Sequence, residues 1–302
     1  MGEFGLIERF FSRAGGDAEL GVGDDAAIIA TTSRTAVAVD TLVSGVHFPQ
    51  DTPAAAIGHR ALAVNLSDLA AIGASPRWFT LALTLPTLDE AWLGAFAEAM
   101  LKLAQQFGVS LVGGDTTRGP LSVTVQVIGE APEVALLRAG ARAGDSVYVG
   151  GYLGDAAGGL YCLLHDQPEG AQRLIDAFHY PQPQLALSQR LLGVASATID
   201  VSDGLLADVG HIARASRCDV DIQRDLLPCS STLRRLFAPS QVSAFALSGG
   251  DDYVLCFTAA NPDLAEELDG ITRVGQCVAG TGAVRVDGMT VDNGGYEHFN
   301  SR

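Results

Sequence analysis

The sequence predicts a mixed α/β protein with two domains. Its 302 residues exceed what one average hydrophobic core holds, so two domains are the first expectation and one large domain the alternative. Hydrophobic residues make up 48% of the chain and charged residues 18%, which leaves ample apolar surface to bury. Apolar residues recur with a period of two in some segments and at helical spacing in others, as expected for strands alternating with helices.

The N-terminal half supplies most of these elements. FTLALTL at 79–85 and LSVTVQVIGE at 121–130 alternate apolar and polar residues, which predicts half-buried strands, and TAVAVDTL at 35–42 is a third. Residues 109–112 predict a short apolar strand that leads into two glycines and Asp115. Residues 53–73 predict a helix.

A second helix follows the strand at 79–85. Thr87 and Glu90 have the T-x-x-E spacing of a capping box, and Gly108 stops the helical pattern. The apolar residues at helical spacing between them are Trp92, Phe96, Met100, Leu103 and Phe107.

The C-terminal half continues the pattern with a strand, a glycine turn and a small-residue helix at 146–160, a helix at 205–217 and a strand at 253–258. Turn residues and arginines at 131–145 indicate the domain boundary. The predicted domains are 1–136 and 137–302.

Charge and residue usage exclude several functions. A formal net charge of −16 disfavours sequence-independent binding to nucleic acid or to an anionic membrane. Lys102 is the only lysine, so neither a P-loop nor a protein-kinase site is present. The five cysteines never have CxxC spacing, which argues against a zinc site or a disulfide framework and fits a reduced cytosol.

Hydropathy indicates neither a membrane span nor export. No uninterrupted apolar run reaches about 18 residues. The first residues, MGEFGLIERFF, carry acids where a signal peptide would need a basic start. We therefore expect a cytoplasmic protein.

Aspartates flanked by small residues recur in six short segments. Turn formation or helix capping explains any one of them, and N-capping alone would explain Ser202 and Asp203 ahead of the helix at 205–217. Such turns ordinarily vary among Asn, Asp, Ser and Gly, whereas all six have Asp. The segments are GVGDDAA (Asp24, Asp25), AVDTL (Asp40), NLSDLAA (Asp68), GGDTT (Asp115), DVSDG (Asp200, Asp203) and SGGDDY (Asp251, Asp252).

Carboxylates gathered in this way predict a divalent cation. They repel one another unless a cation binds between them, and their hard oxygens suit Mg²⁺ or Ca²⁺. Mg²⁺ favours one or two carboxylates combined with phosphate oxygens, and the small flanking residues allow a phosphate to approach the backbone. The chain could thus bind ATP without a P-loop. Arg118 and Arg138 are candidate phosphate ligands, with solvated surface positions as the alternative.

The ordered segments resemble those of the thiamine-monophosphate kinase family. That family is part of the superfamily of aminoimidazole ribonucleotide synthetase, selenophosphate synthetase and a hydrogenase maturation factor. The similar segments span residues 2 to 299: GEFGLIERFF, ELGVGDDAA, DTLVSGVHF, ALAVNLSDLAAIGASP, LVGGDTTRGPLSVT, IDVSDGLLADVGHIA, ALSGGDDYVLCFT and GYEHF.

The resemblance implies a fold and a reaction. The fold would be the two-domain aminoimidazole ribonucleotide synthetase type. Its N-terminal domain, 1–136, would bind ATP and Mg²⁺ and pair with a second copy into a dimeric β-barrel. Its C-terminal α/β domain, 137–302, would cover the nucleotide cleft. The reaction would be phosphorylation of thiamine monophosphate by ATP with several Mg²⁺ ions and no covalent intermediate.

The resemblance also implies roles for individual residues. Asp68, Asp115 and Asp200 would be catalytic, and Gly114, Asp115, Arg138 and Ser202 would contact the nucleotide. His47, Asp251 and Tyr296 would contact thiamine monophosphate. From the residues alone, His47 is more simply a packed turn histidine and Tyr296 a C-terminal core anchor. The implied magnesium ligands are Asp25, Asp40, Asp68, Asp115, Asp200 and Asp203.

Two positions depart from the family pattern. Ala38 and Val39 stand where the family commonly has Ser-Thr oxygen ligands, so backbone carbonyl or water would serve at one metal position. Asp251 stands where the family usually has Glu, and the shorter acid would hold the substrate differently.

Other activities remain as alternatives. A selenophosphate synthetase would need a reactive Cys near the N-terminus, where the first Cys here is Cys162, and a hydrogenase maturation factor would end in Cys, where this sequence ends FNSR. Aminoimidazole ribonucleotide synthetase is the closest enzyme alternative. A calcium-stabilised, non-catalytic binding protein is the alternative from another class, although the sequence has no D-x-[DN]-x-[DN]-G run.

Overall fold

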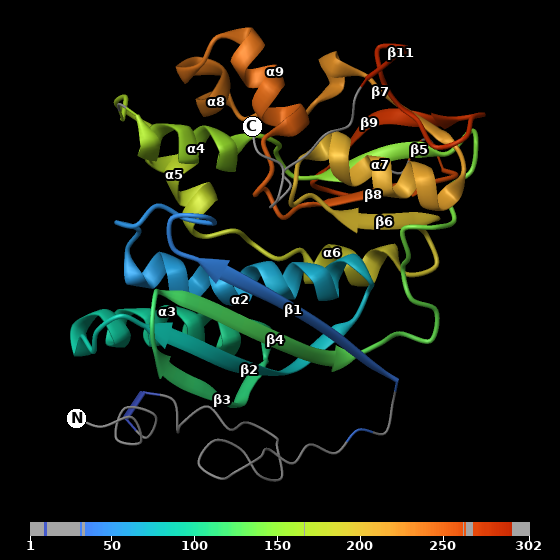
Figure 1. Cartoon of the computed structure of the whole chain (residues 1–302). Coiled ribbons are helices and arrows are strands. Elements are labelled where there is room, and N and C mark those ends of the chain that lie inside the picture. Colours follow the sequence, from blue (N-terminus) through green and yellow to red (C-terminus); the bar gives the residue numbers. More distant parts are fainter. Residues whose placement is uncertain are drawn as a thin grey trace. The chain divides into compact units, whose positions relative to one another are not determined.

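The computed structural model describes residues 9–10, 31, 34–165, 167–261, 263 and 268–291. Two compact units make up the chain, Met1–Leu69 with Ala74–Glu133 and Ala70–Gly73 with Val134–Arg302. Each contains a β-sheet and helices, which confirms the predicted mixed α/β class (Figure 1). No helix within the described ranges is long and apolar enough to cross a membrane. The predicted site residues Asp25 and Tyr296 lie outside the described residues.

The first unit contains a four-stranded sheet and two long helices. Its elements are β1 (Thr35–Val43), α2 (Ala54–Ala71), β2 (Ser75–Leu85), α3 (Glu90–Phe107), β3 (Ser110–Arg118) and β4 (Ser122–Glu130). The strand order is β1-β4-β2-β3, with β4 antiparallel to both β1 and β2 and with β2 parallel to β3. A parallel pair needs a crossover connection, and α3 supplies it. The strands and helices predicted for this half are confirmed.

One face of this sheet is buried and the other is open. Val123, Val125 and Val127 of β4 are completely buried, and so are Leu62 and Leu66 of α2 and Phe96 and Met100 of α3. On β1 the burial alternates residue by residue, so that Val37 and Val39 point the other way and are each 57% exposed. This face, called the open face below, therefore carries exposed apolar side chains on β1, while Trp78 of β2, in the same cross-strand row as Val37, is buried.

The start of α3 differs from the prediction. The N-cap is Asp89, whose carboxylate accepts hydrogen bonds from the amides of Ala91 and Trp92 at 2.9 and 3.1 Å. The predicted capping box of Thr87 and Glu90 is wrong, because Glu90 becomes the first helical residue and cannot reach back as a third-position partner would. The predicted stop is confirmed, with Gly108 in the left-handed conformation at φ 63°.

Strand β3 is longer than predicted. We expected a strand at 109–112 that ended before the two glycines, whereas β3 continues through them to Arg118. The reason is its partner, since β2 pairs with β3 as far as Leu85 opposite Arg118. Asp115 is therefore a strand residue.

The second unit is built on a seven-stranded sheet with the order β11-β10-β7-β9-β5-β8-β6. Its elements are β5 (Ser146–Gly150), α4 (Asp155–Leu164), α5 (Gln172–His179), α6 (Leu185–Leu191), β6 (Ala197–Asp200), α7 (Leu205–Ser216), β7 (Asp219–Ile222), the 3₁₀ turn η2 (Arg224–Leu226), α8 (Ser231–Leu236), α9 (Pro239–Ser248), β8 (Leu255–Ala259), β9 (Ile271–Val278), β10 (Val284–Val286) and β11 (Met289–Thr290). The elements predicted at 146–160, 205–217 and 253–258 are confirmed, the last beginning two residues later. The core lies between this sheet and α7, whose Leu205, Val209 and Ile212 are completely buried.

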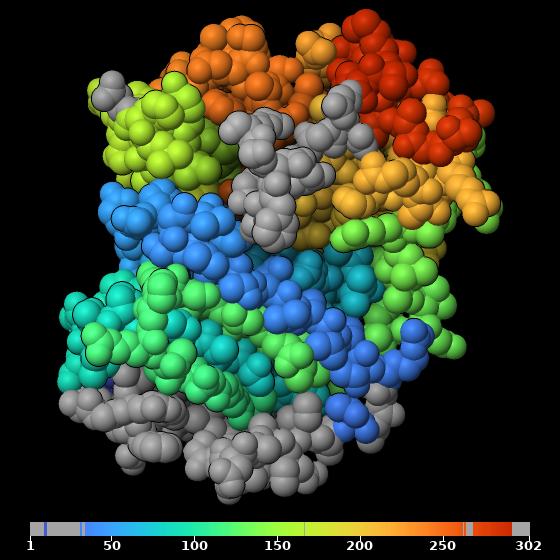
Figure 2. All heavy atoms as spheres, viewed as in Figure 1, coloured from blue at the N-terminus to red at the C-terminus, as the bar shows by residue number. Residues whose placement is uncertain are grey.

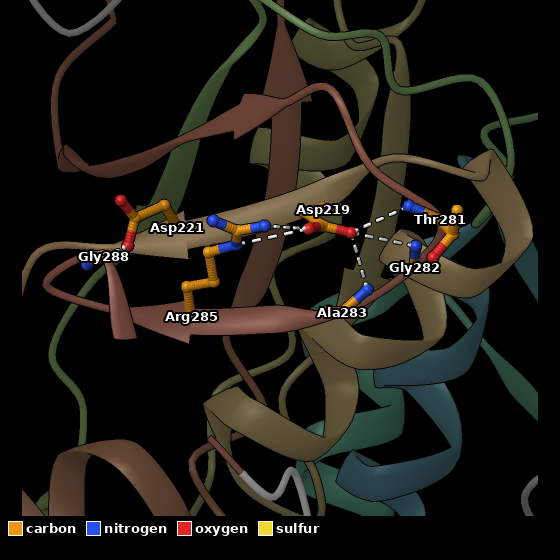
Figure 3. A network of polar contacts seen from close by, with 7 residues as sticks. All are labelled: Asp219, Asp221, Thr281, Gly282, Ala283, Arg285 and Gly288. Carbon is orange, nitrogen blue, oxygen red and sulfur yellow. Dashed lines mark hydrogen bonds and ion pairs between the residues drawn. The ribbon is translucent and has the colours of Figure 1, made fainter. Parts of the chain in front are cut away.

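A single carboxylate fastens one end of this sheet (Figure 3). On Asp219, at the start of β7, one oxygen accepts the amides of Thr281, Gly282 and Ala283 at 2.9, 3.1 and 2.9 Å. The other oxygen accepts two bonds from the Arg285 guanidinium, at 2.7 and 3.2 Å. The amide of Ala283 and the guanidinium of Arg285 lower the pKa of Asp219 to about 2. The segment that leads into β10 is thus held mainly by one ionised side chain.

Replacing Asp219 by asparagine should therefore lower the free energy of unfolding by about 2 kcal/mol at neutral pH. The folded pKa lies below the unfolded value of 3.8, so this stabilisation is complete above pH 3.8 and is lost as the pH falls through about 2. Urea unfolding at several pH values measures it. Asp221→Asn is the matched control, because Asp221 lies two residues along the same strand and accepts one amide, from Gly288 at 3.0 Å. Equal effects of the two substitutions would contradict the assignment.

Candidate active site

Two acidic loops lie side by side in the second unit, just beyond the carboxyl end of β6. Asp200 ends β6 and pairs with Leu255 of β8, so the loops 201–204 and 249–254 are adjacent. Three main-chain hydrogen bonds join them, from Val201 N to Val254 O, from Tyr253 N to Val201 O and from Asp251 N to Ser202 O, each at 2.8 Å. The structure therefore brings four predicted site residues into one region, namely Asp200, Ser202, Asp203 and Asp251.

Glycines permit this close approach. Gly204 and Gly250 have φ values of 109° and 71°, which only glycine adopts readily. A Cβ on Gly250 would lie 2.6 Å from the carbonyl oxygen of Ser202, and one on Gly204 would lie 2.8 Å from the carbonyl carbon of Ser248. The loops leave no room for larger residues at these two positions.

We expect Gly250→Ala to lower the free energy of unfolding by about 2 to 4 kcal/mol, because it adds a clash with main chain to left-handed strain. Gly193→Ala is the matched control. Gly193 has a similar φ of 75° but open space around the missing Cβ, so its substitution should cost only about 1 kcal/mol. Thermal unfolding of both variants measures the difference. Equal losses would mean that the loops do not press together at Gly250.

The backbone of the second loop is strained at its acidic end. Asp251 and Tyr253 adopt left-handed φ angles of 62° and 49°, which are uncommon for residues with side chains. Such strain persists only where surrounding contacts enforce it, and it collects at ligand sites. Here the enforcing contacts are the hydrogen bonds to the 201–204 loop.

Asp208 holds the first loop in place. This buried carboxylate, in the first turn of α7, accepts the amides of Ser202 and Asp203 at 3.0 Å each. Burial, followed by the charges of Asp200 and Asp203, raises the pKa of Asp208 to about 8. Gly204, and neither Ser202 nor Asp203, is the N-cap of α7, and no side chain caps the helix. The capping interpretation of Ser202 and Asp203 is therefore wrong.

Asp252 likewise holds backbone amides, at the start of α4. Its carboxylate accepts the amide of Gly154 at 2.8 Å and that of Ala156 at 3.3 Å, at the N-terminus of that helix. Burial is the largest cause that raises its pKa, to about 8. Asp155, the first residue of α4, accepts the hydroxyl of Ser230 at 2.7 Å, and burial raises its pKa too.

The sequence analysis named neither Asp208 nor Asp155, and it counted Asp252 only among the acids expected to gather around a cation. A usable signal existed for Asp252, because it is the second acid of SGGDDY. Asp208 sits five residues after Asp203, within the same motif region. Their position explains how Asp203 and Asp251 remain in place without serving as caps.

Arg138 lies beside the C-terminal end of α7. It is exposed, and its carbonyl accepts the hydroxyl of Ser216, the last residue of that helix, at 3.2 Å. The 201–204 loop precedes the first turn of the same helix, so the main chain of Arg138 and that loop are at opposite ends of α7. The pKa of His211, in α7, is lowered by burial and then by the charges of Arg214 and Arg138, while Asp203 opposes them.

In the first unit, Asp40 and Asp68 lie where β1 meets α2. The side-chain amide of Asn65 accepts the Asp40 amide at 3.0 Å through its oxygen, and it donates to the Ala61 carbonyl at 2.9 Å through its nitrogen. Asp68 follows Asn65 by three residues and so shares its face of the helix. It is the one residue between 60 and 71 of α2 that is partly exposed.

His47 belongs to the turn after β1. Its Nδ1 accepts the amide of Val43 at 2.9 Å, and its own amide donates to the Val43 carbonyl at 3.0 Å. These bonds agree with the turn interpretation of His47. They also orient the ring, which a substrate contact would require.

Asp115 lies far from Asp40 within this sheet. The pairing register runs from Asp40 through Val125 and Leu81 to Gly114, so Asp40 and Asp115 are on the two opposite edge strands. Three strand spacings of about 4.8 Å separate those edges by roughly 14 Å. Asp115 also pairs with Ala82 in the next row, which faces the open side, whereas Asp40 faces α2.

The direction of the Val39 side chain and the spacing of the acids both bear on metal binding. Val39 is one of the two positions where the family commonly has Ser-Thr. Val39 points to the open face, so the side chain at this position is turned away from Asn65 and α2. Among the residues that the structure describes, no group of three or more His, Cys, Asp or Glu side chains is placed to hold an ion.

Comparisons with known proteins match the whole chain. A family model described as AIR synthase related protein, N-terminal domain, matches residues 23–131. The thiamine-monophosphate kinase of Escherichia coli K12 is 45% identical over 320 residues, covering 99% of this chain and 98% of that protein. The crystal structure of thiamine-monophosphate kinase from Stenotrophomonas maltophilia K279a has a TM-score of 0.88 at 45% identity, covering 96% of this chain and 98% of its own. A structure of AaThiL complexed with AMPPCP and TMP has a TM-score of 0.82 at 32% identity, covering 92% of each chain.

Proposed function

This chain belongs to the thiamine-monophosphate kinase family, and from that premise we propose that it transfers the γ-phosphoryl group of ATP directly to thiamine monophosphate, giving thiamine diphosphate and ADP. Its fold is that of the AIR synthase-related proteins. The observation that carries the proposal is the 45% identity to the Escherichia coli kinase along 99% of this chain. The complex of AaThiL with AMPPCP and TMP supports the choice of ATP and thiamine monophosphate as the two substrates.

We propose nucleotide contacts in each domain separately. In 137–302, Ser202, whose amide donates to Asp208, and the Arg138 guanidinium would contact phosphate oxygens. In 1–136, Gly114 and Asp115 would contact the nucleotide from β3. His47, Asp251 and Tyr296 would contact thiamine monophosphate.

The acids supply suitable ligands for Mg²⁺. Carboxylate oxygens are what this ion prefers, and it ordinarily combines one or two of them with phosphate oxygens. When bound, Mg²⁺ neutralises the charge on the transferring phosphoryl group. The residues that would hold several such ions are Asp25, Asp40, Asp68, Asp115, Asp200 and Asp203.

The protein's own residues would contribute to the reaction by aligning ATP with thiamine monophosphate. Phosphoryl transfer needs the attacking and leaving oxygens in line, and it involves little covalent chemistry by the enzyme. The acceptor phosphate of thiamine monophosphate is already ionised, so no general base is required. The strained loop at Asp251 would orient the acceptor, and the rigid 201–204 loop would orient ATP.

We further infer a homodimer formed through the first unit. Its open sheet face carries Val37 and Val39, each 57% exposed, and exposed apolar faces and edge strands in a sheet are ordinarily covered. Two copies would cover the face and form the β-barrel expected from the family. Sedimentation velocity should give about twice the chain mass of 31.4 kDa, and a monomer at micromolar concentration would refute the pairing.

An ADP-release assay tests the reaction. Mg-ATP with thiamine monophosphate should release ADP and form thiamine diphosphate, whereas thiamine and an aminoimidazole ribonucleotide precursor should not support turnover. Turnover with the aminoimidazole precursor alone would favour the synthetase alternative. Calorimetry separates the remaining alternative, because a calcium-stabilised binding protein would bind Ca²⁺ and show no dependence on Mg-ATP.

A further inference from the structure

A hollow of about 300 Å³ opens in the second unit among η2, α8 and α9. The α8–α9 segment lies at the surface, in orange in Figure 2. The volume of the hollow is at the small end of the range for ligand pockets, roughly 300 to 1,000 Å³. None of its lining residues is among those assigned above to ATP, Mg²⁺ or thiamine monophosphate.

The walls of this hollow are fixed by hydrogen bonds. Ser230 caps α8 by accepting the amide of Leu233 at 3.1 Å, and its hydroxyl donates to Asp155 at 2.7 Å. The Arg234 guanidinium donates to the carbonyls of Cys229 and Leu227 at 3.3 and 3.2 Å. The hollow is therefore preformed, which lowers the entropic cost of filling it.

The lining of the hollow combines apolar residues with charged ones. Leu227, Phe237 and Val242 form the apolar part. Two arginines, Arg224 and Arg234, line it together with one acid, Asp225, which leaves one net positive charge. Arg224 also pairs with Asp287 at 3.5 Å, but both side chains are about half exposed, so solvent weakens this bond. In a chain with a net charge of −16, a positively charged hollow is unusual.

We propose that this hollow is a second ligand site, one that binds a small organic anion. An aromatic or branched aliphatic body would pack against Leu227, Phe237 and Val242, and a single carboxylate, sulfonate or phosphate group would face Arg224 and Arg234. Guanidinium groups bind such groups with charge-assisted hydrogen bonds. The hollow is too small for a nucleoside triphosphate, and its lining lacks the paired acids of a metal site.

Cys229 offers a direct report of occupancy. It lines the hollow and is partly exposed, whereas the other four cysteines of the chain are buried. Iodoacetamide should therefore alkylate Cys229 first, and a bound ligand should slow that reaction. Burial raises the pKa of the Cys229 thiol, so the reaction is run at alkaline pH and followed by mass spectrometry. Cys229→Ser identifies the modified residue.

The experiment uses naphthalene-1-sulfonate as the anionic probe and 1-naphthalenemethanol as its uncharged counterpart, on the full chain. We expect the sulfonate to protect Cys229 at a concentration about tenfold lower than the alcohol. Arg224→Gln should remove about tenfold of the sulfonate's affinity and leave protection by the alcohol unchanged, whereas Arg234→Gln should weaken protection by both probes, because Arg234 also holds the carbonyls of Cys229 and Leu227. Arg235→Gln is the matched control, since Arg235 is the next residue of α8 and does not line the hollow.

A second pair of variants blocks the space itself. Ser243→Trp, on the lining face of α9, should slow alkylation without any probe and abolish the response to the sulfonate. Ala244→Trp, one residue along and outside the lining, should behave as the unchanged protein. Because alkylation does not depend on turnover, the outcome is independent of the proposed kinase activity. Absence of protection at millimolar sulfonate would overturn the site, and equal protection by the two probes would overturn its preference for anions.

Discussion

Asp115→Asn should reduce ADP release from Mg-ATP and thiamine monophosphate at least about a hundredfold. The substitution removes one carboxylate charge from a position assigned to both metal and nucleotide, and it keeps the size of the side chain. Asp115 is exposed on β3, and its side chain makes no hydrogen bond to other described residues, so the free energy of unfolding should change by less than about 0.5 kcal/mol. Steady-state kinetics and thermal unfolding measure the two effects separately.

Glu98→Gln is the control for this substitution. Glu98 is an exposed acid on α3 with no assigned role, so its loss changes the net charge equally and should leave turnover intact. If Asp115→Asn retained full activity, the metal role of Asp115 would be excluded. If it unfolded the protein, Asp115 would be a structural residue.

Gly114→Ala should have the opposite signature, with a large loss of stability as the cause of lost activity. The missing Cβ of Gly114 points at main chain, where it would lie 1.9 Å from the carbonyl oxygen of Leu81 in β2. Backbone cannot move aside as a flexible side chain can, so the β2–β3 pairing beside Asp115 would have to open. We expect a loss of about 3 kcal/mol or more in the free energy of unfolding, measured by urea titration.

The neighbouring residue provides the comparison. Gly113 belongs to the same strand, has no positive φ and has nothing within 4 Å of its missing Cβ. Gly113→Ala should therefore change stability by less than about 1 kcal/mol. Equal destabilisation by the two alanines would show that loss of glycine flexibility, and not contact with Leu81, is responsible.

Periodicity was enough to predict the strands and long helices. The strands at 35–42, 79–85 and 121–130 have one buried and one open face, and that arrangement is visible in the sequence as alternation. The length of β3 was not predictable in this way. Its glycines and polar residues carry no apolar pattern, and they extend only because β2 offers a pairing partner. The start of α3 was also predicted wrongly. Asp89 and Thr87 are both good N-cap residues, and only the turn geometry decides between them.

The residue types of the candidate site could be predicted from the sequence, whereas their positions relative to one another could not. The repeated Asp-and-glycine segments identify acids with unusual surroundings, and the structure does place Asp200, Asp203 and Asp251 beside one another. The separation of Asp40 from Asp115 depends on strand order, which no single segment encodes. The anchoring roles of Asp208 and Asp252 were not predicted, because their partners are backbone amides, which every residue except proline has and which no sequence motif marks.

The two consecutive acids of the 249–254 loop have different roles: Asp252 anchors the loop, and Asp251 is proposed to contact the acceptor. Asp252 ties the loop to the first turn of α4 through the amides of Gly154 and Ala156, and this anchor is separate from the acid at 251. Under the proposed role of Asp251 in binding the acceptor, a longer or shorter acid at 251 would change the reach toward the acceptor, while the contacts of Asp252 with α4 remain.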